Sequence, residues 1–239
     1  NPTIAQFYLK AVTEALEKAK ESFQYVIMDV RDNGDLELLA KCLKNQRMIC
    51  GSSALSEYLA KQEAESAGKG AFRKFTKVRE KVFCMAGSLT PQTIAQTAYM
   101  KQKGCPVFTL DTRKLLNKND REKELKRLYQ EVQRAYKTED FVMIHSMNQP
   151  KEVAETKELA ALAGIGNTEM STLVSSALSE VTRQAVTEYQ IRRIIVCGGD
   201  TSASLCAGLN IRGMRVLEEI EAGLPTCESV EEPYYRMVL

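Results

Sequence analysis

The sequence alternates short apolar runs with longer amphipathic runs, and this alternation restricts the fold more than any other feature. Beyond residue 81, apolar runs of strand length occur at 82–86, 106–110, 141–145 and 193–197. Runs with helical periodicity lie between them, at 91–103, 120–136 and 168–189. Strands that are joined through long helical crossovers pair in parallel, and the helices cover the sheet. The sequence therefore predicts an α/β fold with an open, mostly parallel sheet flanked by helices.

The residues before this region predict a further α/β arrangement. Pro2 favours an opening helix, because a proline in the first turn of a helix loses no hydrogen bond. The apolar runs at 25–30 and 47–50 predict two strands, and each leads into a helical run, at 35–43 and 54–62 respectively. The β-α-β-α order indicates parallel strands here as well.

A domain boundary is expected where the hydrophobic periodicity fades. Between about residues 63 and 81 the chain is polar and charged and contains two glycines. We therefore expect a partial smaller domain over residues 1–66, a linker over 67–81 and a larger domain over 82–239.

Composition argues against several functional classes. Lys and Arg total 33 against 31 Asp and Glu, so a net charge of +2 gives no reason to expect a nucleic acid or an anionic membrane as partner. No apolar stretch is long enough to cross a bilayer, and the first residues lack a secretory signal pattern, so we expect a cytoplasmic protein. With one histidine and no C-x-x-C pair, a Cys/His zinc site is not expected.

The apolar run 193–197 ends in a turn whose residue types suit a nucleotide phosphate. Gly198 and Gly199 permit close approach to the backbone, Thr201 and Ser202 can donate hydrogen bonds, and the start of a helix favours negative charge. Asp200 would repel a bare phosphate, so a functional role for it requires an intervening Mg²⁺. The alternative is that Asp200 or Thr201 only caps the following helix, and the residues alone leave both interpretations open.

A second strand end has related chemistry. The run 82–86 leads into Gly87 and Ser88, after which Thr90 and Pro91 predict the start of a helix. Many such turns contain glycine and serine for backbone reasons only, so an ordinary turn is favoured over a ligand site when this segment is taken alone.

Two other features predict structure rather than chemistry. The helical run 168–189 carries an apolar stripe that we expect to lie in the core, formed by Leu173, Val174, Leu178 and Val181. His145 ends an apolar strand and is expected to be a hydrogen-bonded structural residue rather than a general base.

Together these motifs resemble one known family. The stretch Gly198-Gly-Asp-Thr-Ser202 with Ala222-Gly-Leu-Pro225 is similar to the C-terminal nucleotide-binding domain of four-carbon acid sugar kinases. Gly87-Ser-Leu-Thr90 is similar to an earlier segment of that domain, and the region around Gly51-Ser52 looks like the end of the family's N-terminal substrate-binding domain. The resemblance covers nearly the whole chain.

The resemblance implies transfer of the ATP γ-phosphoryl group to a hydroxyl of a tetronate-like acid sugar, with Mg²⁺. It places ATP at Gly87 and Ser88 and at the GGDTS turn, that is, Gly198, Gly199, Asp200, Thr201 and Ser202, with Asp200 acting through Mg²⁺. Gly51 and Ser52 would face the substrate, although an ordinary turn is the favoured explanation for them. The resemblance assigns no catalytic residue within this chain.

The sequence departs from the family in ways that limit this expectation. Ala54 and Ala203 stand where the family has glycine, and neither the D-D-x-T-G motif nor the K-S-G-x-F-G loop occurs. We therefore expect an ATP-binding portion that is incomplete for catalysis and lacks the N-terminal substrate-binding segment. The alternatives are a non-catalytic regulatory module that binds a nucleotide or sugar acid, and a Rossmann-like oxidoreductase, against which the missing G-x-G-x-x-G argues. Whether two chains pair as a homodimer stays open.

Overall fold

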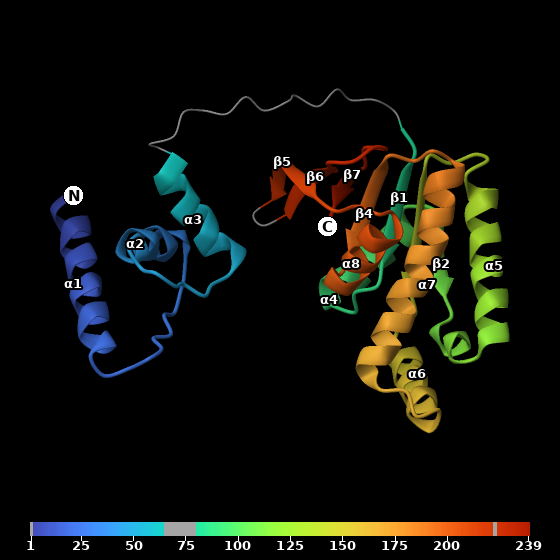
Figure 1. The fold of residues 1–239 in the computed structure, drawn as a ribbon, viewed down its shortest axis with the longest axis horizontal. Coiled ribbons are helices and arrows are strands. Elements are labelled where there is room, and N and C mark those ends of the chain that lie inside the picture. Colours follow the sequence, from blue (N-terminus) through green and yellow to red (C-terminus); the bar gives the residue numbers. More distant parts are fainter. Residues whose placement is uncertain (1, 65–79, 222–223) are drawn as a thin grey trace. The chain divides into compact units, whose positions relative to one another are not determined.

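A computed structural model describes residues 2–64, 80–221 and 224–239 (Figure 1). The chain divides into two compact units, Asn1–Phe72 with Glu221–Gly223, and Arg73–Ile220 with Leu224–Leu239. Most of the expected linker 67–81 lies outside the described residues. Each unit is therefore described by itself.

The first unit contains three described helices, α1 (Pro2–Lys20), α2 (Asn33–Leu43) and α3 (Ser53–Ala64). Asp32 caps α2, because its carboxylate accepts hydrogen bonds from the backbone N–H groups of Gly34 and Asp35 at 2.9 and 3.1 Å. The buried side chains of this unit come from α1 and α2, namely Leu16, Leu36, Leu39, Ala40 and Cys42. The described part of the unit is thus a small helical assembly.

The strands predicted at 25–30 and 47–50 were wrong. Neither segment pairs with another strand among the described residues, and the Tyr25, Ile27 and Met48 side chains are 87, 94 and 91% exposed. A strand forms only where a neighbour accepts its backbone hydrogen bonds and covers one of its faces. The apolar, β-branched composition identified segments suited to a sheet, but the described unit contains no sheet to receive them.

The second unit carries one seven-stranded sheet in the order β2-β3-β1-β4-β7-β6-β5. Its strands are β1 (Val82–Ala86), β2 (Val107–Leu110), β3 (Phe141–Ser146), β4 (Arg193–Cys197), β5 (Met214–Glu221), β6 (Leu224–Ser229) and β7 (Arg236–Val238). Its helices are α4 (Pro91–Gln102), η1 (Thr112–Leu116), α5 (Lys118–Ala135), α6 (Pro150–Leu162), α7 (Asn167–Glu188) and α8 (Gly199–Gly208). The five neighbouring strands β2, β3, β1, β4 and β7 run parallel, and β6 is antiparallel to β7. The predicted α/β fold with a mostly parallel sheet is confirmed.

The central strand β1 is apolar on both faces because helices cover both. Phe83 and Met85 belong to the large core that includes α5, α7 and α8, whereas Cys84 and Ala86 pack on the other face with Met100 of α4. These four of the five β1 side chains are at most 5% exposed. A strand buried on both sides reads as an unbroken apolar run, which is why the sequence located it.

The strands β1 and β4 lie side by side, but their following helices take opposite faces. Ala86 and Cys197 are partners in register at the carboxyl ends of the two strands. From there the chain enters α4 on one face and α8 on the other. Such a divergence opens a crevice at the carboxyl edge of a parallel sheet, where ligands of α/β proteins bind.

Candidate functional site

The turns that follow β1 and β4 are joined through one carbonyl oxygen. The backbone N–H groups of Gly87 and Ser88 both donate to the carbonyl oxygen of Cys197, each at 3.1 Å. This bond pair continues the parallel pairing of the two strands past their last residues. The two glycine-containing turns are therefore held together at one edge of the sheet.

Glycine is required in both turns. A Cβ at Gly87 would lie 2.2 Å from the Thr201 Oγ1 of α8, far inside contact distance. Gly198 has φ +125°, which side chains rarely adopt, and a Cβ there would lie 3.2 Å from the backbone nitrogen of Ser88. The glycines thus let α8 approach β1 closely.

The helix α8 begins beside this junction without a side-chain cap. Its N-cap is Gly198, which has no side chain to accept a hydrogen bond. By contrast, the side chains of Thr90 and Asn117 cap α4 and α5. The first N–H groups of a helix have no partner within the helix, so those of α8 are available to a ligand. A Cβ at Gly199 would meet no atom within 4 Å, which leaves space in front of them.

This helix start opens into a cleft of about 490 Å³. The end of β3, the turns after β1, β3 and β4, and the helices η1, α6, α7 and α8 line the cleft. The lining residues are Gly87, Ser88, Leu89, Thr112, Ser146, Met147, Val153, Thr156, Lys157, Asn167, Met170, Ser171, Val174, Ser175, Gly198, Gly199, Asp200 and Thr201. Among these, Lys157 and Asp200 carry the only charges. The volume suits a ligand of nucleotide size.

Most of the predicted ATP-binding residues line one cleft of the second unit. Gly87, Ser88 and the four residues from Gly198 to Thr201 all line the cleft. Ser202 is not among the lining residues, and its hydroxyl donates to the carbonyl oxygen of Gly198 at 2.9 Å. Gly51 and Ser52 lie in the first unit, where the Ser52 carbonyl accepts the Ser56 N–H just as α3 begins.

Sequence reasoning missed the contribution of α6 and α7 to the cleft. Val174 packs against the core as its stripe predicted but also lines the cleft, and Leu178 and Val181 of the same stripe are buried in the core as expected. A signal was available in α7, because Asn167, Ser171 and Ser175 recur every four residues and so form a polar stripe. For α6, no comparable pattern singles out Lys157.

His145 is buried behind the site and is uncharged near neutral pH. Its Nδ1 lies 2.7 Å from the Ser146 carbonyl oxygen and must donate to it, so Nε2 accepts from the Thr109 hydroxyl at 2.9 Å. Burial lowers the pKa of His145 to about 4, and the Lys101 charge adds to this effect. The ring is 2% exposed and does not line the cleft, which supports a structural role.

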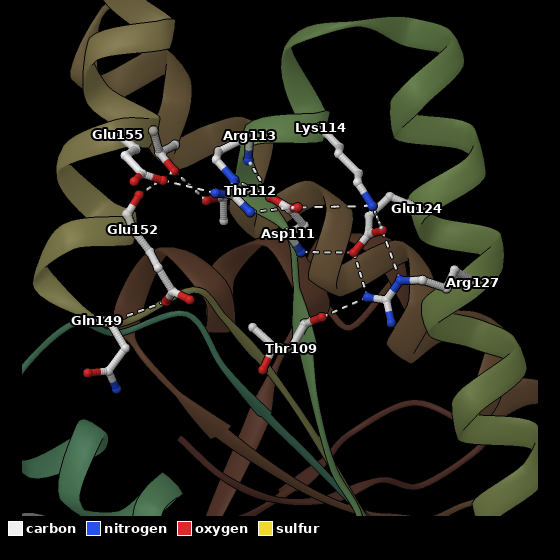
Figure 2. A network of polar contacts seen from close by, with 11 residues as sticks. Thr109, Asp111, Thr112, Arg113, Lys114, Glu124, Arg127, Gln149, Glu152 and Glu155 are labelled. Atoms are coloured by element: carbon white, nitrogen blue, oxygen red, sulfur yellow. Dashed lines mark hydrogen bonds and ion pairs between the residues drawn. The ribbon is translucent and has the colours of Figure 1, made fainter.

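A polar network fixes the wall that η1 contributes (Figure 2). The Glu124 side chain of α5 is fully buried and accepts hydrogen bonds from the Asp111 backbone N–H, Lys114 and Arg127. Burial raises the pKa of Glu124, but these hydrogen bonds outweigh it and hold the pKa below its usual value. Thr112, which lines the cleft, meets the hydroxyl of Thr156 on α6 at 2.8 Å.

On its other side the network reaches α6. Arg113 pairs with Asp111 at 2.9 Å and with Glu155 of α6 at 2.9 Å. The Glu155 side chain therefore ties α6 to the segment that follows β2. As a result, α5, η1 and α6 are linked through side chains that lie next to the cleft without filling it.

The cleft offers one carboxylate, that of Asp200, as a ligand for a divalent ion. The described residues contain no group of three or more His, Cys, Asp or Glu that could hold a metal by themselves. Mg²⁺ at kinase sites is bound through one or two carboxylates together with phosphate oxygens and water. Asp200, an exposed carboxylate at the start of α8, fits this pattern as a single protein ligand.

Comparisons with known proteins agree on one family. Residues 83–239 match the family described as the nucleotide-binding C-terminal domain. The chain is similar to 3-oxo-tetronate kinases of Haemophilus influenzae (24% identical over 219 residues) and Actinobacillus succinogenes (27% over 222 residues), with 92% of this chain covered in each case. It spans about half the length of these curated relatives, 50% in each. A crystal structure of a Salmonella typhimurium protein matches 97% of this chain and 52% of its own, with a TM-score of 0.68 and 25% identity.

In the part of the chain that the structure describes, no helix has the length and apolar character to cross a membrane.

Proposed function

The chain belongs to the family of nucleotide-binding C-terminal domains, and from that premise we propose that its cleft binds ATP for phosphoryl transfer to an acid sugar. The acceptor would be a hydroxyl of a four-carbon, tetronate-like acid, as the names of its relatives suggest. One observation carries the proposal. The uncapped start of α8 and the turn after β1 meet at the carboxyl edge of the sheet and open into a cleft of nucleotide size.

The phosphates would lie against the start of α8. There the backbone N–H groups of Gly199, Asp200 and Thr201 would donate to phosphate oxygens, and the helix dipole favours their negative charge. Ser88 adds a hydroxyl from the turn after β1, and Lys157 adds a positive charge from α6. Phosphoryl transfer depends mainly on such positioning and charge neutralisation.

Two predicted residues take supporting places in this proposal. Ser202 would stabilise the turn, since its hydroxyl is bonded to the Gly198 carbonyl oxygen. Asp200 would hold Mg²⁺ together with the phosphates, and the ion would neutralise charge on the transferred group. Gly51 and Ser52 remain candidates for contact with the acid sugar.

The proposal is tested by calorimetric titration of ATP, with and without Mg²⁺. Wild type should bind ATP more tightly with Mg²⁺. Asp200→Asn should lose that gain, by about tenfold, the usual order for a lost interaction with a charged group. Asp120→Asn is the matched control, because Asp120 is an exposed carboxylate in the first turn of α5 that does not line the cleft. An unchanged Mg²⁺ dependence in Asp200→Asn would remove the metal role.

The acceptor is tested separately by ³¹P NMR. The protein is incubated with ATP, Mg²⁺ and either a tetronate or a six-carbon sugar without a carboxylate. Appearance of a phosphomonoester signal with the tetronate alone supports the acid-sugar assignment. Because the chain spans about half the length of its relatives, nucleotide binding without any phosphomonoester favours the regulatory alternative only if it persists when the substrate-binding domain of such a relative is supplied.

A further inference from the structure

The wall of the cleft formed by α6 and α7 differs chemically from the turns at the sheet edge. The turns contribute mainly glycine backbone and hydroxyls, whereas the helices contribute Val153, Met170 and Val174 as apolar side chains. Figure 1 shows α6 beside the first turns of α7. We call Val153, Met170, Val174 and Ser175 the helix wall. An apolar surface with a few polar atoms is what an aromatic base requires, and it offers little to a phosphate.

The spacing on α7 places apolar and polar groups next to each other. Met170 and Val174 are four residues apart, as are Ser171 and Ser175, so the two pairs form adjacent stripes on the same side of the helix. Met170 is 7% exposed, and Val174 is half-buried. A flat ligand could therefore pack on the first stripe and hydrogen-bond to the second.

Ser175 offers a hydroxyl to the cleft beside the apolar stripe. Its side chain is 7% exposed, lines the cleft and forms no hydrogen bond with the described part of the chain. The next residue, Ser176, instead donates to the Leu173 carbonyl oxygen at 3.0 Å, and Thr172 donates to the Thr168 carbonyl at 3.0 Å. The Ser175 hydroxyl is therefore available to a ligand in the cleft, and a polar ligand atom within reach of it would gain one hydrogen bond.

We propose that the helix wall binds the nucleoside part of ATP, with the base packed on Met170 and Val174 and a polar nucleoside atom bonded to the Ser175 hydroxyl. This inference rests on the proposed function and extends it, because it assigns the orientation of the nucleotide. The triphosphate lies at the start of α8 and the base lies between α6 and α7. Neither Val174 nor Ser175 would touch a phosphate.

The test compares ATP with inorganic tripolyphosphate, which has the phosphate chain but no nucleoside. Two pairs of neighbouring variants are used. Val174→Ala is matched by Leu173→Ala, because both side chains are partly buried and pack against the core, but only Val174 also lines the cleft. Ser175→Ala is matched by Ser176→Ala. Far-UV circular dichroism checks that each variant is folded.

Val174→Ala removes two methyl groups from the base contact and should weaken ATP binding by about 5- to 10-fold. Ser175→Ala should weaken it by about 3- to 10-fold, the usual range for one lost hydrogen bond. Tripolyphosphate affinity should stay within about twofold of wild type in both variants, and the two controls should leave both affinities unchanged.

Two results would overturn the inference and leave the proposed function intact. In one, Val174→Ala and Ser175→Ala weaken tripolyphosphate as much as ATP. In the other, they behave like Leu173→Ala and Ser176→Ala. If wild type binds neither compound, the proposed function fails and the inference fails with it. Should Leu173→Ala unfold, the serine pair decides the question by itself.

Discussion

Replacing Gly87 with alanine tests the close approach of α8 to β1. The new Cβ would lie 2.2 Å from Thr201 Oγ1, 3.3 Å from Thr201 Cβ and 3.4 Å from Thr201 Cγ2. Thr201 is 2% exposed and β-branched, so its side chain has little freedom to move away. Overpacking of this kind lowers the free energy of unfolding by about 1–3 kcal/mol. We expect Gly87→Ala to destabilise the second unit by that amount.

The same contact predicts that the cost depends on Thr201. In a Thr201→Ala background, Oγ1 and Cγ2 are absent and the nearest remaining Thr201 atom is 3.3 Å away, a contact that a small shift relieves. Gly87 does not adopt a left-handed conformation, so alanine then benefits from a less flexible unfolded chain, by about 0.4–1 kcal/mol. The double-mutant cycle should therefore give a coupling energy of about 1.4–4 kcal/mol, the difference between a loss in one background and a gain in the other.

The measurement is urea unfolding of the four cycle members, followed by far-UV circular dichroism. Gly199→Ala serves as the control, because a Cβ at Gly199 meets no atom within 4 Å and should not destabilise the fold. If Gly87→Ala destabilises the protein equally in both backgrounds, the Thr201 contact is not the cause and the reasoning is refuted.

Three further predictions concern the residues around the cleft. Gly198→Ala should lower the free energy of unfolding by about 1–3 kcal/mol and weaken ATP binding, because the backbone angle φ of +125° at Gly198 disfavours any residue with a Cβ. Urea unfolding measures the first effect and calorimetry the second, and wild-type values in both would contradict the reasoning. Because burial lowers the pKa of His145 to about 4 from an unfolded value near 6.5, its neutral form stabilises the fold above pH 6.5, and up to about 3 kcal/mol is lost as the pH falls from 6.5 through 4. His145 is the single histidine, so an NMR titration of its ring reads the pKa directly, and a value of 6.5 or more would refute this. Glu124→Gln should destabilise by about 1–3 kcal/mol through weaker bonds to Arg127 and Lys114, measured by urea unfolding at pH 7, and the difference from wild type should shrink as the pH falls below about 4.5.

The centre of the sheet could be predicted from sequence because of how it is buried. The predicted runs 82–86 and 193–197 coincide with β1 and β4 residue for residue. β1 is apolar throughout because both of its faces are covered, and β4 is apolar after Arg193. A glycine directly follows each strand. The runs at 25–30 and 47–50 have similar composition, yet they form no strand in the described unit, because composition does not reveal whether a neighbouring strand exists.

Other elements had weaker or unused signals. The helix α6 was not predicted, although Pro150 at its first position and the capping box of Gln149 with Glu152 mark its start. The strand β7 spans only Arg236–Val238, and nothing local indicates that it pairs in parallel with β4. Its place depends on a contact between segments that are distant in sequence.

The candidate site was predictable only on the side of the turns. The motif around Gly198 was recognisable because it combines glycines, hydroxyls and a carboxylate over a few residues. The helix wall was not, because Val174 has the same apolar character as the core residues Leu178 and Val181 on its helix. Only the packing of α6 beside α7 reveals that Val174, at the margin of the core, also lines a cleft.

The shared carbonyl of Cys197 makes the two turns respond together. Because the Gly87 and Ser88 amides bond to one oxygen, a displacement of the segment after β4 changes the length of both bonds at once. Exchange of these two amide protons with solvent therefore reports on events at the neighbouring turn. A ligand that orders the residues after Cys197 should slow deuterium uptake at Gly87 and Ser88 in parallel, even when it touches neither.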